Sequence, residues 1–95
     1  MRIGKEKMKE YEKIKEELYL KQYGTCLICK KMLVGKLDLH HKMRNTEGNR
    51  IRYPKLINSI HNLELLHHNC HINRHGEAGK LSDVDAEIIE KKLNG

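Results

Sequence analysis

The sequence predicts a small α+β domain in which zinc holds together a core of two short strands and a helix, with a further helix at each end. The chain has 95 residues, no Phe or Trp and a charged fraction of 34%, so it can bury only a modest core. Domains of this kind usually need an additional constraint. Cys and His residues recur at spacings typical of metal ligands, and short alternating segments lie between terminal segments of helical periodicity.

Residues 5–23 are expected to form the N-terminal helix. Apolar residues recur there at steps of three and four and form one stripe, which consists of Met8, Tyr11, Ile14 and Leu18. Gly24 is placed to end the helix. Residues 1–24 are therefore predicted to be a helical arm that packs over a small core.

The next segments predict short strands. Residues 25–36 are expected to form a tight turn flanked by short strands, and LDLHH, residues 37–41, shows the alternation of a strand. On that strand Leu37, Leu39 and His41 share one face, and Asp38 and His40 share the other. Residues 42–61 are polar and are expected to form a long loop, which in a compact domain is often functional.

The second half of the chain predicts one more strand and two helices. NLELL, residues 62–66, is the second strand, and a helix is expected from about His68 to His75. Ser82 or Asp83 can cap a last helix over 84–93, whose inward residues are expected to be Val84, Ile88, and Leu93 or Ile89. We predict one domain over 1–95, with the arm at 1–24, the core at 25–78 and the C-terminal helix at 79–95.

The net charge of +6 is concentrated in the middle of the chain. Residues 30–55 carry eight Lys or Arg against two acidic residues, and 8 − 2 equals the whole excess. Such a segment suits a polyanion such as nucleic acid, although a solubilising loop has the same composition. The candidate DNA-binding residues are Lys42, Arg44, Arg50, Arg52 and Lys55.

The cellular compartment follows from the thiols and from the start of the chain. Three cysteines cannot all pair with one another, and no apolar run resembles a signal peptide or a membrane span. We therefore expect an intracellular, cytoplasmic protein with reduced thiols and no membrane partner. In that setting a metal is a better constraint than a disulfide.

One group of Cys and His residues has the spacing of a structural zinc site. Cys26 and Cys29 form a C-x-x-C pair, and His67 and Cys70 repeat the same spacing. Together they make a closed Cys₃His site for Zn²⁺. His68 is an alternative to His67 as the fourth ligand.

A second group of histidines is expected to serve a different metal ion. His71 and His75, at i and i+4, share one face of the predicted helix. Cys70 and His71 are about 100° apart around that helix and so point in different directions. His71 and His75 can meet the pair His40 and His41, and a site with few imidazole ligands keeps open positions for chemistry.

The constellation resembles the HNH endonuclease family, which has a ββα-metal, treble-clef-like fold. The matching segments, in the order of the family, are CLIC (26–29), LDLHH (37–41), HNLELL (61–66) and HHNCHINRH (67–75). They span roughly residues 25–76. The ending is most similar to HNH modules of mobile elements, such as group II intron proteins, and of small phage nucleases; its H-x-x-x-H also resembles the nuclease colicins.

The resemblance implies a role for each matching residue. His41 would be the general base, and His40 and His71 would hold the catalytic divalent ion. His75 would be a third ligand or a phosphate contact, and Asn62 would hold His41 and its loop. The chain departs from the family in using His67 where cysteine is more usual, and in lacking Pro-rich and Gly-Gly signals between His41 and Asn62.

The function implied is hydrolysis of phosphodiesters in double-stranded DNA by a metal-dependent endonuclease. The cofactors would be a structural Zn²⁺ and a catalytic Mg²⁺, Mn²⁺, Ni²⁺ or Zn²⁺. No base-reading module is evident, so nicking or weakly specific cleavage is expected unless a homodimer or a larger phage or mobile-element assembly directs it. The alternatives are a non-catalytic, zinc-stapled DNA-binding accessory module and a protein-interaction domain that uses the basic loop.

Overall fold

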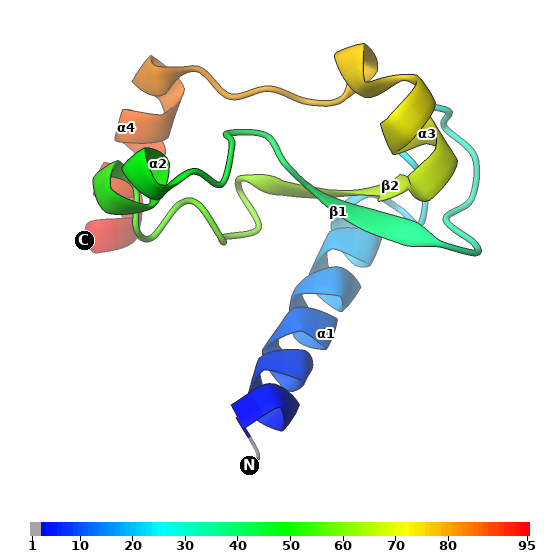
Figure 1. Cartoon of the computed structure of the whole chain (residues 1–95), viewed down its shortest axis with the longest axis horizontal. Coiled ribbons are helices and arrows are strands. Elements are labelled where there is room, and N and C mark those ends of the chain that lie inside the picture. Colours follow the sequence, from blue (N-terminus) through cyan, green and yellow to red (C-terminus); the bar gives the residue numbers. More distant parts are fainter. Residues whose placement is uncertain (1–2) are drawn as a thin grey trace.

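The chain forms a small α+β fold in which a β-hairpin packs against helices (Figure 1). The computed structural model describes residues 3–95, and describes side chains from Tyr11 onward. The elements are α1 (Ile3–Lys21), β1 (Leu37–His41), α2 (Glu47–Arg52), β2 (Leu63–His67), α3 (His68–Asn73), the 3-10 turn η1 (His75–Glu77) and α4 (Asp83–Asn94). The predicted fold class, with helices at both ends, is confirmed. Within residues 3–95, no helix is both long and apolar enough to span a membrane.

The hairpin sets the register of Asp38, His40 and His41. β1 and β2 pair antiparallel, with Leu37 opposite His67 and His40 opposite Glu64. The predicted bounds of β1 are confirmed, and β2 begins and ends one residue later than expected. Because side chains alternate along a strand, Asp38 and His40 share the face on which α3 lies.

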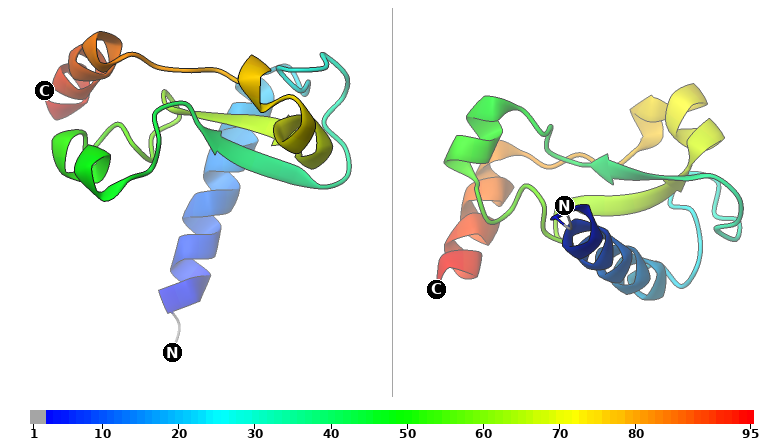
Figure 2. Two further views of the ribbon diagram at one scale, coloured as in Figure 1. Left: turned by 45° about the horizontal axis from the view of Figure 1, so that its top comes forward. Right: turned by 60° about the horizontal axis from the view of Figure 1, so that its bottom comes forward.

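The arm α1 leaves the hairpin on the side opposite α3 (Figures 1 and 2). Gln22 attaches it: the side-chain amide accepts from the Leu65 backbone N–H at 2.7 Å and donates to the Leu65 carbonyl at 2.9 Å. Of the predicted stripe, Leu18 is buried and Ile14 is half-buried, whereas Tyr11 is 48% exposed. Met8 lies outside the described side chains, so only the C-terminal part of the stripe is seen to pack.

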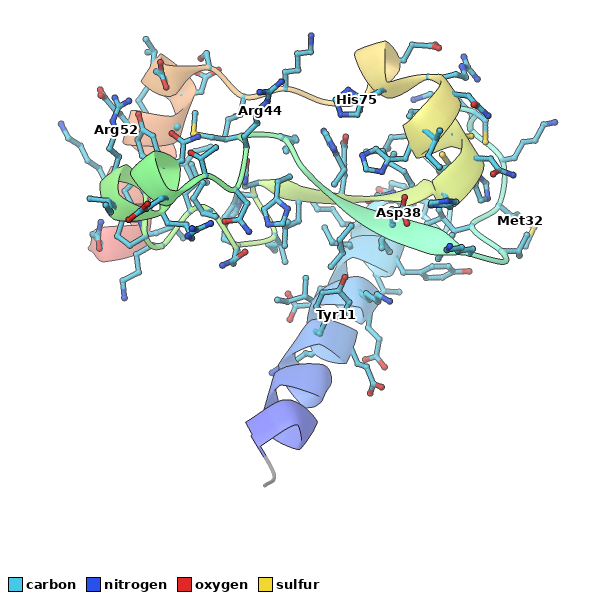
Figure 3. The ribbon with its side chains drawn as sticks, in the orientation of Figure 1. Tyr11, Met32, Asp38, Arg44, Arg52 and His75 are labelled. Atoms are coloured by element: carbon cyan, nitrogen blue, oxygen red, sulfur yellow. The ribbon has the colours of Figure 1, made fainter. Side chains whose placement is uncertain are left out.

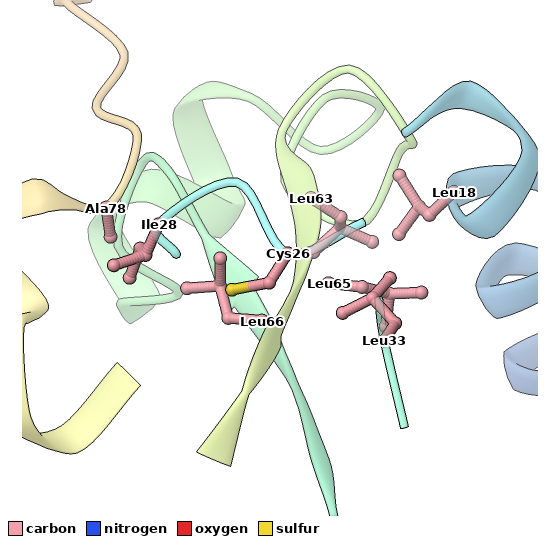
Figure 4. Close-up of a cluster of buried hydrophobic side chains, with 8 residues drawn as sticks. All are labelled: Leu18, Cys26, Ile28, Leu33, Leu63, Leu65, Leu66 and Ala78. Carbon is pink, nitrogen blue, oxygen red and sulfur yellow. The ribbon is translucent and has the colours of Figure 1, made fainter. Parts of the chain in front are cut away.

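The main core lies beside β2 (Figure 4). Its buried side chains come from the end of α1, the Cys26–Leu33 turn, β2 and the segment after η1. They are Leu18, Cys26, Ile28, Leu33, Leu63, Leu65, Leu66 and Ala78. The cysteine turn is thus part of the core, with Thr25 and Met32 bridged as a minimal antiparallel pair.

The segment 42–61 was expected to be a long polar loop, and this prediction is wrong. It contains α2, capped by Thr46, whose side chain accepts from the Asn49 N–H, and it forms a second core. Tyr53, Leu56 and Ile57 are almost fully buried there and pack with Met43 and Ala86. Apolar residues of this segment do recur at steps of three and four, at Tyr53, Leu56, Ile57 and Ile60, and this spacing indicates that they are buried.

The inward face of α4 also differs from the prediction. Val84, Ile88 and Leu93 are exposed, whereas Ile89, the predicted alternative to Leu93, is half-buried and packs against the second core; Ala86 and Glu90 are buried. The reason is that Glu90 caps the turn after α2. Its carboxylate accepts from the backbone N–H groups of Lys55, at 3.1 Å, and Leu56, at 2.8 Å. Glu90 faces inward because these backbone N–H groups need an acceptor when they are shielded from water.

Candidate functional site

Four of the predicted zinc ligands come together at one end of the hairpin. Cys26 and Cys29 come from the turn after α1, His67 ends β2, and Cys70 lies in the first turn of α3. Their ligand atoms all lie within 4.8 Å of one another. Three thiol sulfurs and one imidazole nitrogen are the donor set of a closed tetrahedral zinc site, so the group fits a structural Zn²⁺.

The structure shows which of His67 and His68 belongs to the Cys₃His group. The His67 Nε2–H donates to the Met32 carbonyl at 2.8 Å, which leaves Nδ1 facing the Cys29 Sγ at 3.3 Å. His68 points to the other side of α3, where its Nδ1 lies 2.9 Å from Asp38. His67 is therefore the histidine of the Cys₃His group.

The surroundings of this group shift the pKa values of its three thiols in different directions. Burial raises the pKa of Cys26, but backbone N–H donors outweigh it and lower that pKa to about 6. The pKa of Cys29 is also lowered, chiefly by a hydrogen bond from the backbone of Lys31. Burial and the neighbouring sulfurs raise the pKa of Cys70 to about 11. Without metal, repulsion between neighbouring thiolates opposes the ionisation of all three sulfurs. A bound cation would offset that repulsion.

A second group, here called the histidine cluster, consists of His40, His71 and His75. Their ligand atoms lie within 4.8 Å of one another, and their ring centroids are 5.2 to 5.4 Å apart. His40 is buried, His71 is half-buried and His75 is exposed, beside the linker after η1 (Figure 3). The cluster is thus closed on one side and open on the other, as a metal site with exchangeable positions requires.

His40 is held by a short chain of hydrogen bonds. Its Nε2–H donates to the Gly79 carbonyl at 3.0 Å, and the Gly79 N–H donates to the Glu64 carboxylate at 2.7 Å. A Cβ at Gly79 would lie 2.9 Å from the Glu64 Oε2, so a side chain there would displace the Glu64 carboxylate. Burial lowers the pKa of His40. A neutral His40 with Nε2 occupied presents Nδ1 as its ligating atom.

The side chains of His41 and Asn62 belong to different hydrogen-bond networks. Asn62 is fully buried; its side chain accepts from the Met43 N–H at 2.7 Å and donates to the carbonyls of Met43 and Ile57. Asn62 therefore holds the backbone that follows β1. The ring of His41 instead places Nε2 3.1 Å from the Asn58 Oδ1, a partner that the sequence analysis did not identify.

His41 and the histidine cluster line the same open hollow, which has a volume of about 710 Å³. Its wall also includes the first residues after β1, the start of α2 and the linker between η1 and α4. The polar lining residues beyond the histidines are Lys42, Arg44, Asn45, Thr46, Asn49 and Lys80. A substrate in this hollow would meet both the proposed ligands and the proposed base.

The predicted DNA-binding residues are divided by the fold. Lys42 and Arg44 line the hollow, together with Lys80, which was not among the predicted residues. Arg50, Arg52 and Lys55 lie on or after α2, away from the lining of the hollow; Arg52 comes within 3.9 Å of Glu87 on α4. Figure 3 shows Arg44 near the linker and Arg52 at the far end of the molecule.

Glu64, Lys80 and Asn58 belong to this site but were not predicted, and only the first two carry a signal in the sequence. Glu64 is a charged residue inside the apolar strand β2, and the antiparallel pairing places it opposite His40. Lys80 follows a Gly in the segment after the last histidine. Asn58 has no such signal, because its approach to His41 depends on the turns of segment 53–62.

Comparison with protein-family models, with curated proteins and with solved structures gives no match. The fold and the two ligand groups therefore define the chain as a small α+β protein with a Cys₃His group suited to zinc and a separate cluster of histidines.

Proposed function

We propose that the chain is a metal-dependent DNA endonuclease of the HNH type. The observation that supports this proposal is the shared hollow, in which three histidines able to hold a divalent ion stand beside a fourth histidine outside their group. A closed zinc group elsewhere provides structure, so the histidine cluster is left for chemistry. A DNA-binding module alone has no need of this second arrangement.

His41 is the general base. The Asn58 amide oxygen can only accept, so the His41 Nε2 carries the hydrogen and its Nδ1 keeps a lone pair. That nitrogen takes a proton from a water molecule, the water oxygen bonds to phosphorus, and the bond to the 3′ oxygen breaks. The products would be a 5′-phosphate and a 3′-hydroxyl, which takes its proton from solvent.

His40, His71 and His75 would hold the divalent cation. When bound, the cation would neutralise charge on the phosphate and on the leaving oxygen. Imidazole donors suit Mn²⁺, Ni²⁺ and Zn²⁺ better than Mg²⁺, so transition metals should support activity at least as well. Lys42, Arg44 and Lys80 line the hollow and would contact backbone phosphates, which carry affinity but little sequence information.

The test is a plasmid-nicking assay with zinc-loaded protein and a panel of Mg²⁺, Mn²⁺, Ni²⁺ and Zn²⁺. We expect the wild type to convert supercoiled to open-circular DNA, and His41→Ala to lose at least about 100-fold in rate while it keeps its zinc. The matched control is His61→Ala, which removes an exposed histidine outside the hollow and should cut like the wild type.

Cleavage that persists in His41→Ala would show that His41 is not the base. If no metal supports cleavage although DNA is still bound, the protein is the alternative, a non-catalytic zinc-containing DNA-binding module. Binding of neither DNA nor a second metal would remove both nucleic-acid functions.

A further inference from the structure

Asp38 contacts the histidine cluster from outside it, through a carboxylate oxygen. One carboxylate oxygen, Oδ2, lies 2.9 Å from the Nδ1 of His71 and 2.9 Å from the Nδ1 of His68. Asp38 is on β1, two residues before His40, and both histidines are on α3. Figure 3 shows Asp38 between the strand and this helix. The carboxylate thus ties α3 to the hairpin through two imidazole rings.

The protonation of these groups follows from their chemistry. An aspartate carboxyl has an ordinary pKa of about 3.9, far below neutral pH. Asp38 is therefore ionised at neutral pH and can only accept hydrogen bonds. Each Nδ1 that faces Oδ2 must then carry a hydrogen, and a neutral His71 keeps its lone pair on Nε2.

We propose that Asp38 is a positioning residue that holds His71 as its Nδ1–H tautomer, so that Nε2 faces the histidine cluster as a metal ligand. This inference rests on the proposed function only in treating the cluster as a metal site. A ligating histidine commonly donates its other ring nitrogen to a carboxylate or a carbonyl, which fixes the ring and strengthens the ligand.

The three ligands are then held to different degrees. His71 donates to a carboxylate, and His40 donates to the Gly79 carbonyl. Among the described hydrogen bonds, none involves the His75 ring, and that ring is exposed. His71 is therefore the strongest ligand of the cluster and His75 the weakest.

His68 has a separate place in this arrangement. It shares Oδ2 with His71 but is not part of the histidine cluster. Its removal leaves the contact between Asp38 and His71 in place. His68→Ala is therefore a matched control for the loss of Asp38, since both variants break a bond of the same carboxylate.

The first experiment needs no variant. Long-range ¹H–¹⁵N correlation spectra of zinc-loaded wild-type protein, free of other metals, at pH 8 report which ring nitrogen of each neutral histidine carries hydrogen. We expect His71 and His68 as Nδ1–H tautomers and His40 as the Nε2–H tautomer. An Nε2–H tautomer of His71 would overturn the proposal.

The second experiment measures Ni²⁺ binding to zinc-loaded protein by calorimetry, with zinc content checked before and after. Asp38→Ala should weaken Ni²⁺ binding about 10- to 100-fold and leave His71 as a mixture of tautomers. His68→Ala should keep both the tautomer and the affinity, within about twofold.

Unchanged Ni²⁺ affinity in Asp38→Ala, or an equal loss in His68→Ala, would overturn the positioning role. Neither readout uses DNA. A protein that shows the expected tautomer and affinities but cuts no DNA would refute the proposed nuclease while leaving this inference intact.

Discussion

Cys70 and His71 are adjacent on α3, yet Cys70 belongs to the Cys₃His group and His71 to the histidine cluster. A turn of about 100° between neighbouring helical residues directs the two side chains into different ligand groups. The helix has only six residues, too few to be stable alone, so its orientation depends on what its ends bind. The Cys₃His group and the histidine cluster are therefore coupled through one short helix.

Removal of zinc should consequently abolish metal binding at the histidine cluster. We expect chelated, zinc-free protein to lose Ni²⁺ binding measured by calorimetry, together with helical circular dichroism. The reverse should not hold: His71→Ala should lose Ni²⁺ binding and keep its zinc. Zinc-free protein that binds Ni²⁺ with unchanged affinity would show that the two sites are independent.

Gly79→Ala should impair both stability and the histidine cluster. The added Cβ would lie 2.9 Å from the Glu64 Oε2 and 3.0 Å from the Lys42 side chain, so the Glu64 carboxylate, which accepts from the Gly79 N–H beside His40, must move. We expect a loss of about 1–3 kcal/mol in the free energy of unfolding, measured with denaturant, and weaker Ni²⁺ binding. Gly76→Ala, whose Cβ would meet nothing within 4 Å, is the control and should change neither.

Asn62 and Asn58 should differ in what their loss affects. Asn62→Ala leaves buried backbone groups of Met43 and Ile57 without partners, and should cost about 2–4 kcal/mol of stability in denaturant unfolding. Asn58 is exposed and contacts the ring of His41, so Asn58→Ala should change stability by less than about 0.5 kcal/mol while slowing plasmid nicking. If Asn58→Ala nicks at the wild-type rate, the contact does not orient the base.

Zinc binding should release protons and strengthen as the pH rises. Cys26, with a pKa of about 6, is mostly a thiolate at pH 7.5, whereas Cys70, with a pKa of about 11, must give up a proton to bind metal. We expect release of at least about one proton per zinc, measured in buffers of different ionisation enthalpy. Below about pH 6 Cys26 also becomes protonated, so the affinity should fall more steeply. An affinity independent of pH between 6.5 and 8 would contradict this assignment.

Lys30 occupies a backbone position that suits glycine. Its φ is +65°, in the left-handed region, and its N–H donates to the Cys26 carbonyl at 2.9 Å inside the cysteine turn. A left-handed conformation costs a side-chain-bearing residue roughly 1–2 kcal/mol, partly offset by the flexibility of an unfolded glycine. Lys30→Gly should therefore raise the free energy of unfolding by about 0.5 kcal/mol, and Lys30→Val should lower it.

The parts that could be predicted depend on local patterns. The alternation of LDLHH correctly placed Asp38 beside His40, and helical spacing correctly separated Cys70 from His71. The inward position of Glu90 was not predictable in this way, because it depends on unpaired N–H groups 34 and 35 residues away in the chain. Likewise, only the folded turns decide that Asn58 rather than Asn62 meets the ring of His41.

The arm α1 gives the protein a convenient attachment point for engineering. Its 19 residues form a rod about 28 Å long that leaves the hairpin on the side opposite α3. The hollow opens on the α3 side, since residues of α3 and of the linker after η1 line it. A programmable DNA-recognition module fused ahead of this rod would be held away from the hollow, and the rod would set the spacing between the recognised sequence and the hollow.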